Sequence, residues 1–163
     1  MRVGVLGGGQ LGRMLALAGY PLGLRFRFLD PSPDAPAGHV GTLVAGSFSD
    51  PDTLRRFRSD VDVVTYELEH VPYSVVEALN RETPVLPGPR AIHVAQDRLL
   101  EKQFFQSVGI PTGWFAPVAA PQALAAAAEE AGYPCLLKTR RQGYDGKGQR
   151  WLRSSADLSA AWE

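Results

Sequence analysis

The chain has 163 residues, of which 45% are hydrophobic and 21% charged, and its 17 basic residues balance 17 acidic ones. A chain of this length and apolar content can form one packed domain, or one domain and part of another, and is not typical of a disordered segment. Its zero formal net charge argues against a general nucleic-acid or membrane-surface binder, which would carry an excess of Lys and Arg.

A single cysteine, Cys135, excludes an internal disulfide and favours a reducing compartment, so we expect a cytoplasmic protein. The apolar run at residues 1–7 is too short for a signal peptide, and no apolar stretch approaches the ~20 residues of a membrane span. The sequence therefore predicts neither nucleic-acid nor membrane partners.

The first 96 residues alternate between short apolar runs and amphipathic segments. A buried strand is expected at residues 2–6, followed by helical spacing of apolar residues over 10–22, which Gly23 would end. Further strands are expected at 24–29, 43–45, 61–66 and 85–86, with helices at 50–58 and 72–81. The repeated β-α-β order predicts a doubly wound α/β domain, with about five mostly parallel strands and helices on both faces.

After Pro89 the order of elements changes. Helices are expected at residues 90–95, 98–108 and 121–131, strands at 114–115, 135–138 and 149–152, and a last helix from about 156, capped by Ser155. We place the domain boundary near Gln96, which divides the chain into residues 1–96 and 97–163. A hairpin with one crossing helix cannot close a core of its own, so we expect these residues to contain only part of the second domain.

Gly7-Gly8-Gly9-Gln10-Leu11-Gly12 matches the GxGxxG spacing between a strand and a helix. Such glycines bring an anion to the helix N-terminus, and Asp30 lies near the distance expected of a ribose-binding acid. The pattern leaves three readings open: a dinucleotide site, another phosphate ligand, or close strand-helix packing alone. Gln10 and Arg13 favour a polar phosphorylated metabolite, although Arg13 also fits a solvated helix face.

Glu67 and Glu69 follow the expected strand at 61–66, at the carboxyl edge where open α/β sheets bind ligands. In extended backbone, residues two apart point the same way, so both glutamates could reach one ligand and accept from its amine or hydroxyls. The alternative is that one caps or pairs locally and the other is solvated. His70 is expected to be structural or solvent-facing, because the histidines show no metal-ligand spacing.

The segment 138–153 carries six basic residues and one acidic residue, with glycines at 143, 146 and 148. It joins two expected strands, and Lys138 stands at the end of the first. A basic, glycine-rich hairpin tip is suited to cover the phosphates of a nucleoside triphosphate. It is not a Walker loop, which needs a helix after Gly-Lys-Ser/Thr. The alternative is a solvated basic hairpin or an RNA-binding patch.

Four runs of residues, spread over the whole chain, share their order and spacing with one enzyme family. They are Gly7 to Met14, Thr65 to Val71, Gln96-Asp97-Arg98 with Lys102, and Lys138 to Gln149. On these runs the chain resembles the N5-carboxyaminoimidazole ribonucleotide synthetases of the ATP-grasp superfamily. Gln142 departs from the family, which more often has a second glycine before Gly143.

The resemblance implies a Rossmann-like pre-ATP-grasp domain with a parallel sheet, followed by the beginning of an ATP-grasp domain. It implies that ATP phosphorylates bicarbonate to carboxyphosphate, which carboxylates the 5-amino group of aminoimidazole ribonucleotide in purine biosynthesis. The ATP site would include Arg98, Lys138, Gly143, Gly146, Lys147, Gly148 and Gln149. The ribonucleotide site would include Gly9, Gln10, Leu11, Glu67, Glu69, Tyr144 and Asp145.

The resemblance also implies Mg²⁺, whose ligands we expect beyond these 163 residues, and a homodimer as in the family. We therefore expect the chain by itself to be inactive. Two other functions stay open at this point: a non-catalytic nucleotide-binding fragment, and a Rossmann dinucleotide-binding module.

Overall fold

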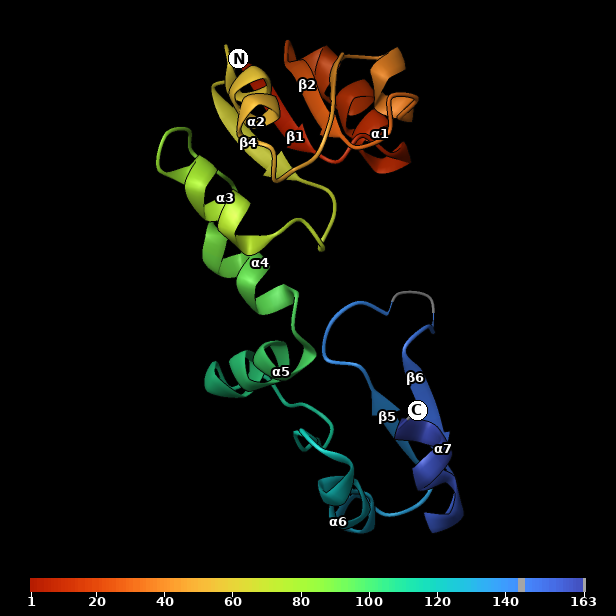
Figure 1. Ribbon diagram of the computed structural model, residues 1–163. Coiled ribbons are helices and arrows are strands. Elements are labelled where there is room, and N and C mark those ends of the chain that lie inside the picture. The colour runs from red at the N-terminus through yellow and green to blue at the C-terminus, as the bar shows by residue number, and fades with distance from the viewer. Residues whose placement is uncertain (144–145, 163) are drawn as a thin grey trace. The chain divides into compact units, whose positions relative to one another are not determined.

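The computed structural model describes residues 1–143 and 146–162, and the chain divides into two compact units, Met1–His93 and Val94–Glu163 (Figure 1). Unit 1 contains a sheet of four strands: β1 (Arg2–Leu6), β2 (Arg25–Asp30), β3 (Thr42–Ala45) and β4 (Val63–Tyr66). Their order is β3-β2-β1-β4, and every neighbouring pair is parallel.

The strand expected at residues 85–86 is reduced to an isolated parallel bridge between Val64 and Val85. Val64 N donates to the Pro84 carbonyl, and Leu86 N donates back to the Val64 carbonyl. The ladder cannot lengthen because Pro84 and Pro87 flank this dipeptide and proline has no N–H to donate.

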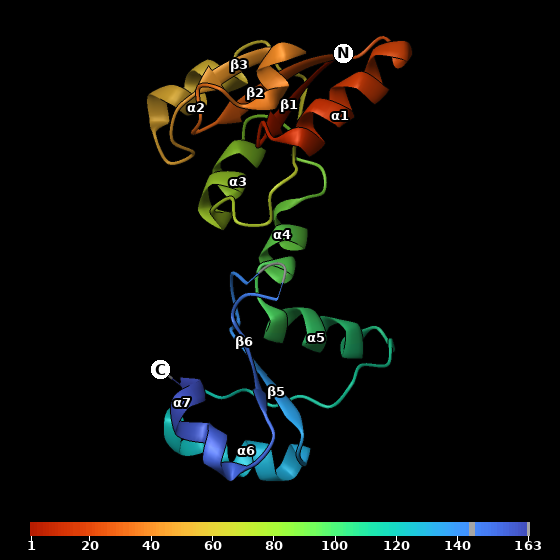
Figure 2. The ribbon, with the colours of Figure 1, turned by 90° about the vertical axis from the view of Figure 1, so that its right-hand side faces the viewer.

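The helical elements of this half of the chain are α1 (Gln10–Gly19), η1 (Tyr20–Leu22), η2 (Pro36–His39), α2 (Pro51–Arg58), α3 (Tyr73–Asn80) and α4 (Pro89–Ala95). Helix α1 and η2 cover one face of the sheet through a cluster that includes Val5 and Phe28, whereas α2 and α3 cover the other face with Leu6 and Val64. Figure 2 shows α1 and α2 on opposite sides of the sheet. The doubly wound α/β prediction is confirmed.

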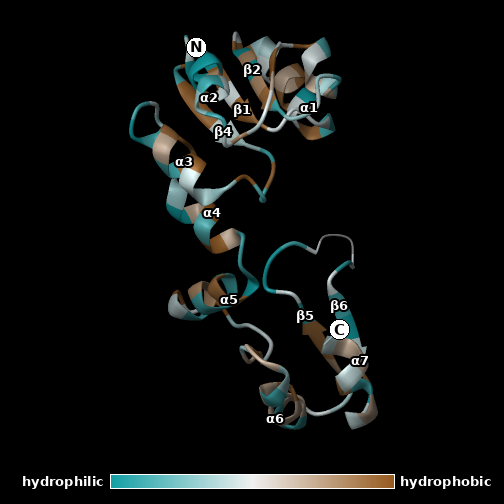
Figure 3. Cartoon of the chain, viewed as in Figure 1, coloured by the Kyte–Doolittle hydropathy of each residue, from teal (hydrophilic) through white to brown (hydrophobic). Residues whose placement is uncertain are grey.

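Unit 2 contains α5 (Arg98–Ser107), α6 (Pro121–Ala131), β5 (Cys135–Lys138), β6 (Gln149–Leu152), η3 (Ser155–Asp157) and α7 (Leu158–Trp162). Strands β5 and β6 pair antiparallel, and a small core joins Leu124 and Ala128 of α6 to Leu152 of β6. Figure 3 shows β5 as hydrophobic and the start of the loop after it as hydrophilic.

Two expectations for unit 2 are wrong. Residues 114–115 form no strand, because the described part of the chain offers them no strand to pair with. The last helical segment is capped by Ser154 rather than Ser155: the Asp157 carboxylate accepts from Ser154 N at 3.1 Å and closes a capping box.

Among the described residues, no helix combines the length and the apolar character needed to cross a bilayer.

Candidate functional site

The glycine loop between β1 and α1, residues 7–12, is held from both sides by carboxylates of unit 1. Gly7 has a φ of 104°, which L side chains rarely adopt, and this turns the chain away from β1. Gly8 N donates to Asp30 Oδ2 at 2.8 Å, and Gly9 N donates to Glu67 Oε1 at 2.7 Å. Asp30 ends β2 and Glu67 follows β4, so both carboxylates come from the carboxyl edge of the sheet.

The two residues after Gly9 begin α1 and face solvent. Gln10 is exposed, and the Leu11 side chain is 66% exposed. Gly9 itself is the N-cap of the helix, and the first turn contains no acidic residue of its own. This turn presents the amide side chain of Gln10 and backbone N–H groups that have no acceptor within the helix, at the carboxyl edge of the sheet.

The two glutamates do not share a direction through extended backbone. Strand β4 ends at Tyr66, the chain bends at Glu67, and residues 69–70 form a turn. Glu67 is half-buried against the glycine loop, whereas Glu69 is exposed. The expectation that both side chains point the same way assumed that the strand continues through Glu69. It is wrong because β4 ends at Tyr66, one residue before Glu67. His70 is exposed.

Unit 2 contains a cavity of about 490 Å³ between the segment 114–118, α6 and the β5–β6 pair. Its lining is apolar over much of its area and includes the side chains of Trp114, Phe115, Leu136 and Trp151. Its charged lining residues are all basic: Arg98, Lys102, Lys138 and Arg140. Such a lining can hold a flat, uncharged ring against aromatic groups and an anion against the cations.

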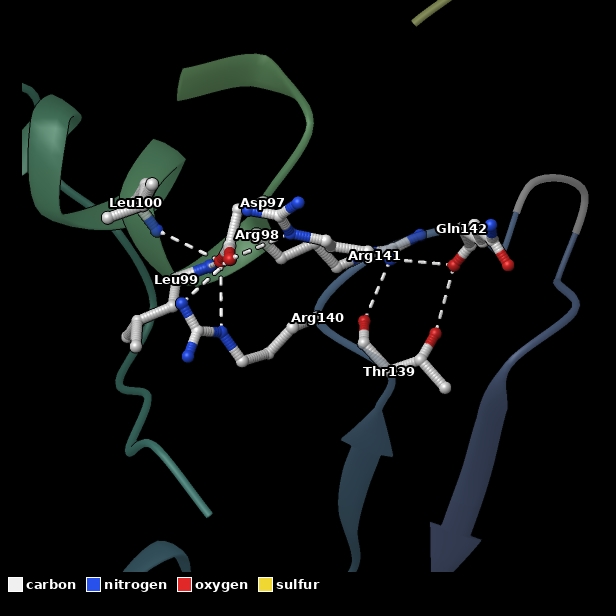
Figure 4. Close-up of polar contacts among 8 residues, drawn as sticks. All are labelled: Asp97, Arg98, Leu99, Leu100, Thr139, Arg140, Arg141 and Gln142. Atoms are coloured by element: carbon white, nitrogen blue, oxygen red, sulfur yellow. Dashed lines mark hydrogen bonds and ion pairs between the residues drawn. The ribbon is translucent and has the colours of Figure 1, made fainter. Parts of the chain in front are cut away.

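Asp97 binds the first residues of the loop between β5 and β6, residues 139–148, which we call the basic loop (Figure 4). Its buried carboxylate accepts from Arg140 Nε at 3.0 Å and Nη2 at 2.7 Å, and from Arg141 Nε at 3.4 Å. It also caps α5, accepting from Leu99 N at 3.0 Å. Burial by itself raises the pKa of Asp97, but the hydrogen bonds from Arg140 and the helix N–H groups outweigh it and hold the pKa below its ordinary value.

Arg98, beside it, is turned toward the loop backbone. Its Nη1 donates to the carbonyls of Thr139 at 2.8 Å and Gln142 at 3.2 Å, and its Nη2 donates to the Gly143 carbonyl. The sequence pointed to Arg98 as a phosphate contact but missed Asp97. An acid directly before an expected helix is the pattern of an N-cap, and this signal could have identified it.

The loop glycines all have positive φ: 110° at Gly143, 80° at Gly146 and 68° at Gly148. Gln142 also has a positive φ of 55°, a conformation that glycine adopts more readily than residues with a side chain. Lys138, Lys147 and Gln149 are exposed. The predicted site residues Tyr144 and Asp145 lie outside the described residues.

Within the described residues, no group of three or more His, Cys, Asp and Glu side chains could hold a metal ion.

A doubly wound parallel unit followed by a strand pair with a basic glycine loop defines the first part of an ATP-grasp protein. Residues 103–163 match the family model described as the ATP-grasp domain, and residues 1–96 match the model described as the ribonucleotide synthetase preATP-grasp domain. The chain belongs to this ribonucleotide synthetase family.

Named relatives agree with this assignment. An N5-carboxyaminoimidazole ribonucleotide synthase of Pseudomonas aeruginosa is 49% identical over 99% of this chain and 45% of its own length. The crystal structure of the N5-carboxyaminoimidazole ribonucleotide synthetase from Thermus thermophilus is 51% identical, with a TM-score of 0.91 over 99% of this chain and 43% of that one.

The synthase of Aspergillus clavatus, in a structure described as a complex with ADP and 5-aminoimidazole ribonucleotide, is 33% identical. Its TM-score is 0.85, over 98% of this chain and 42% of that one. The chain thus spans less than half the length of the relatives it matches. The resemblance stated from the sequence is confirmed.

Proposed function

We propose that this chain supplies nucleotide- and ribonucleotide-binding residues of an ATP-dependent ligase that carboxylates aminoimidazole ribonucleotide. Bicarbonate and ATP would form carboxyphosphate, and the 5-amino group of the ribonucleotide would attack its carbonyl carbon. The products are the N5-carboxy compound, ADP and phosphate. The observation that carries the proposal is the cavity of unit 2, whose lining joins aromatic rings to four basic side chains.

In the cavity, Trp114 and Trp151 would contact the adenine, and Lys138 would bind phosphate oxygens. Lys138 is the last residue of β5, so the strand fixes the point from which its side chain extends toward the loop that follows. Lys147 and Gln149, with the backbone of the three loop glycines, would approach the phosphates from the loop. Arg98 would fix the loop by donating to the carbonyls of Thr139 and Gly143, and its remaining N–H groups would reach an anion.

The ribonucleotide would contact unit 1 at the first turn of α1, through the backbone of Gly9 and Leu11 and the amide of Gln10. Exposed Glu69, or half-buried Glu67, would accept from an amine or hydroxyl. The family resemblance also assigns Tyr144 and Asp145 to the ribonucleotide site. The relative from Aspergillus clavatus, with ADP and 5-aminoimidazole ribonucleotide, supports the pairing of these two ligands.

Mg²⁺ would neutralise charge on the transferred phosphoryl group. From the family resemblance, the proposal also includes a cytoplasmic location and a homodimer.

Tryptophan fluorescence tests nucleotide binding directly, because two of the three tryptophans line the cavity. We expect ATP and ADP to change the fluorescence of this chain saturably. Lys138→Ala should weaken ATP binding by about 10- to 100-fold, the effect of one charge-assisted contact. Arg153→Ala removes a positive charge outside the cavity lining and serves as the matched control. Equal ATP affinity in both variants would refute the role of Lys138.

Activity is tested in a longer protein that carries these residues. ADP release should require bicarbonate and aminoimidazole ribonucleotide together. ADP release that is independent of the ribonucleotide would argue for a nucleotide-binding protein of another function.

A further inference from the structure

The three glycines of the GxGxxG spacing all face one side chain, that of Glu67. A Cβ at Gly7 would lie 2.5 Å from Glu67 Cγ, one at Gly9 would lie 3.0 Å from Oε1, and one at Gly12 would lie 3.1 Å from Oε2. A methyl group at Gly7 would clash with the Glu67 side chain, and one at Gly9 or Gly12 would require the carboxylate to shift by a few tenths of an ångström. The spacing that predicts a phosphate loop therefore has another physical explanation here: it makes room for an internal carboxylate.

The Glu67 carboxylate lies where an anion would bind at the start of α1. Its Oε1 accepts from Gly9 N at 2.7 Å, and its Oε2 is buried without a hydrogen-bond partner among the described residues. That second oxygen lies beside Gly12, over the first helical turn, whose N–H groups have no acceptor within the helix. A negative charge there is stabilised by the helix dipole, and the first turn has no acid of its own.

Asp30 completes the enclosure of the loop. Its Oδ2 accepts from Gly8 N at 2.8 Å, and the Gly8 carbonyl accepts from Ala37 N at 2.9 Å. Two successive N–H groups of the loop, those of Gly8 and Gly9, are thus bonded to carboxylates of the chain itself. A phosphate entering here would have to displace these bonds and approach two like charges.

We propose that Glu67 is a positioning residue that replaces a bound phosphate: its carboxylate fills the anion niche of the loop 7–12 and holds the loop in one conformation. The start of α1 is then preformed for its ligand, and the niche cannot take the pyrophosphate of a dinucleotide. This role concerns the loop itself and does not depend on the proposed carboxylation.

The niche is tested by removing the carboxylate and returning a small one from solution. In the full chain, we expect Glu67→Ala to lower the melting temperature by roughly 4–8 °C, as the loss of one buried hydrogen bond does in a domain of this size. Formate should restore more than half of the loss. The exposed Glu69→Ala is the matched control, and formate should change neither its melting temperature nor that of the unaltered chain.

Two results would overturn the proposal. One is the same response to formate in all three proteins, and the other is a melting temperature of Glu67→Ala within 1–2 °C of the unaltered chain, roughly the effect of a neutral surface change. If Glu67→Ala does not fold, Glu67→Gln keeps one acceptor oxygen and loses the charge. The amide proton resonance of Gly9 should then move upfield in the NMR spectrum, and an unmoved resonance would likewise overturn the proposal.

Anion titrations test the exclusion separately. Millimolar inorganic phosphate or NADH should leave the Gly8 and Gly9 amide resonances of the unaltered chain in place, whereas phosphate should shift them in Glu67→Ala. Saturable shifts in the unaltered chain would show that the niche accepts phosphate, against the proposal.

Discussion

Replacing Asp97 with asparagine removes one negative charge from the root of the basic loop and changes little else. Asparagine has the same shape and is as good an N-cap as aspartate, so α5 keeps its cap. What is lost is mainly the ion pair with Arg140, which donates from Nε at 3.0 Å and from Nη2 at 2.7 Å, together with the longer ion pair to Arg141 Nε at 3.4 Å. The variant therefore isolates the contribution of the pair from that of the helix cap.

The magnitude follows from the unequal exposure of the two partners. The Asp97 side chain is 3% exposed and that of Arg140 is 54% exposed. Removing one partner of a fully buried pair costs about 3–5 kcal/mol, whereas an exposed pair contributes about 0–1 kcal/mol. Because water can solvate Arg140 once its partner is lost, we expect Asp97→Asn to lower the free energy of unfolding by about 1–3 kcal/mol.

Urea unfolding of four proteins measures this pair: the unaltered chain, Asp97→Asn, Arg140→Gln and the double variant. The cycle should give a coupling energy of at least about 0.5 kcal/mol, the lower limit for residues in contact. Arg150→Gln, on β6, is the matched control and should show no coupling to Asp97. A coupling energy of zero for Arg140, or the same coupling for Arg150, would refute the assigned role of Asp97.

The same pair predicts a pH dependence. The pKa of Asp97 is lower in the folded chain than its ordinary value of about 3.9. Its ionised form therefore stabilises the fold above that ordinary value, and the stabilisation is lost as the pH falls from about 4 toward the folded pKa. The unaltered chain should lose more stability than Asp97→Asn over this window, and parallel losses would contradict the assignment.

Three further substitutions test the packing. Gly4→Ala should lower the free energy of unfolding in urea by about 1–3 kcal/mol, because the new Cβ would lie 2.8 Å from the Phe57 ring of α2. An unchanged unfolding midpoint would refute this contact. Leu152→Ala should cost about 2–5 kcal/mol, since this side chain is 1% exposed, and a loss below this range would show that the small core of unit 2 collapses around the gap. Gly148→Ala should cost about 1–2 kcal/mol and weaken ATP binding, because φ is 68° and the new Cβ would lie 2.5 Å from Thr139 Oγ1. Gly113→Ala, with nothing within 4 Å of its Cβ, is the control that should change neither quantity.

Local sequence determined most element types and several of their ends. The expected helix at 121–131 and strands at 135–138 and 149–152 have the same bounds in the structure. Gly132 marks the end of the helix and Gly148 the start of the second strand, because a positive φ is a property of one residue and needs no knowledge of distant neighbours. The β-α alternation of the first half likewise determined a parallel sheet, since parallel strands need crossover helices between them.

Tertiary structure alone decided what the charged groups do. Glu67 and Gly9 lie 58 residues apart, and Asp97 lies 43 residues from Arg140, so no local period or spacing connects either pair. The GxGxxG spacing showed that something fits closely against the loop, but a phosphate and an internal carboxylate demand the same absence of Cβ atoms. Only the strand order β3-β2-β1-β4, which places the ends of β2 and β4 on either side of β1, brings Asp30 and Glu67 to that loop.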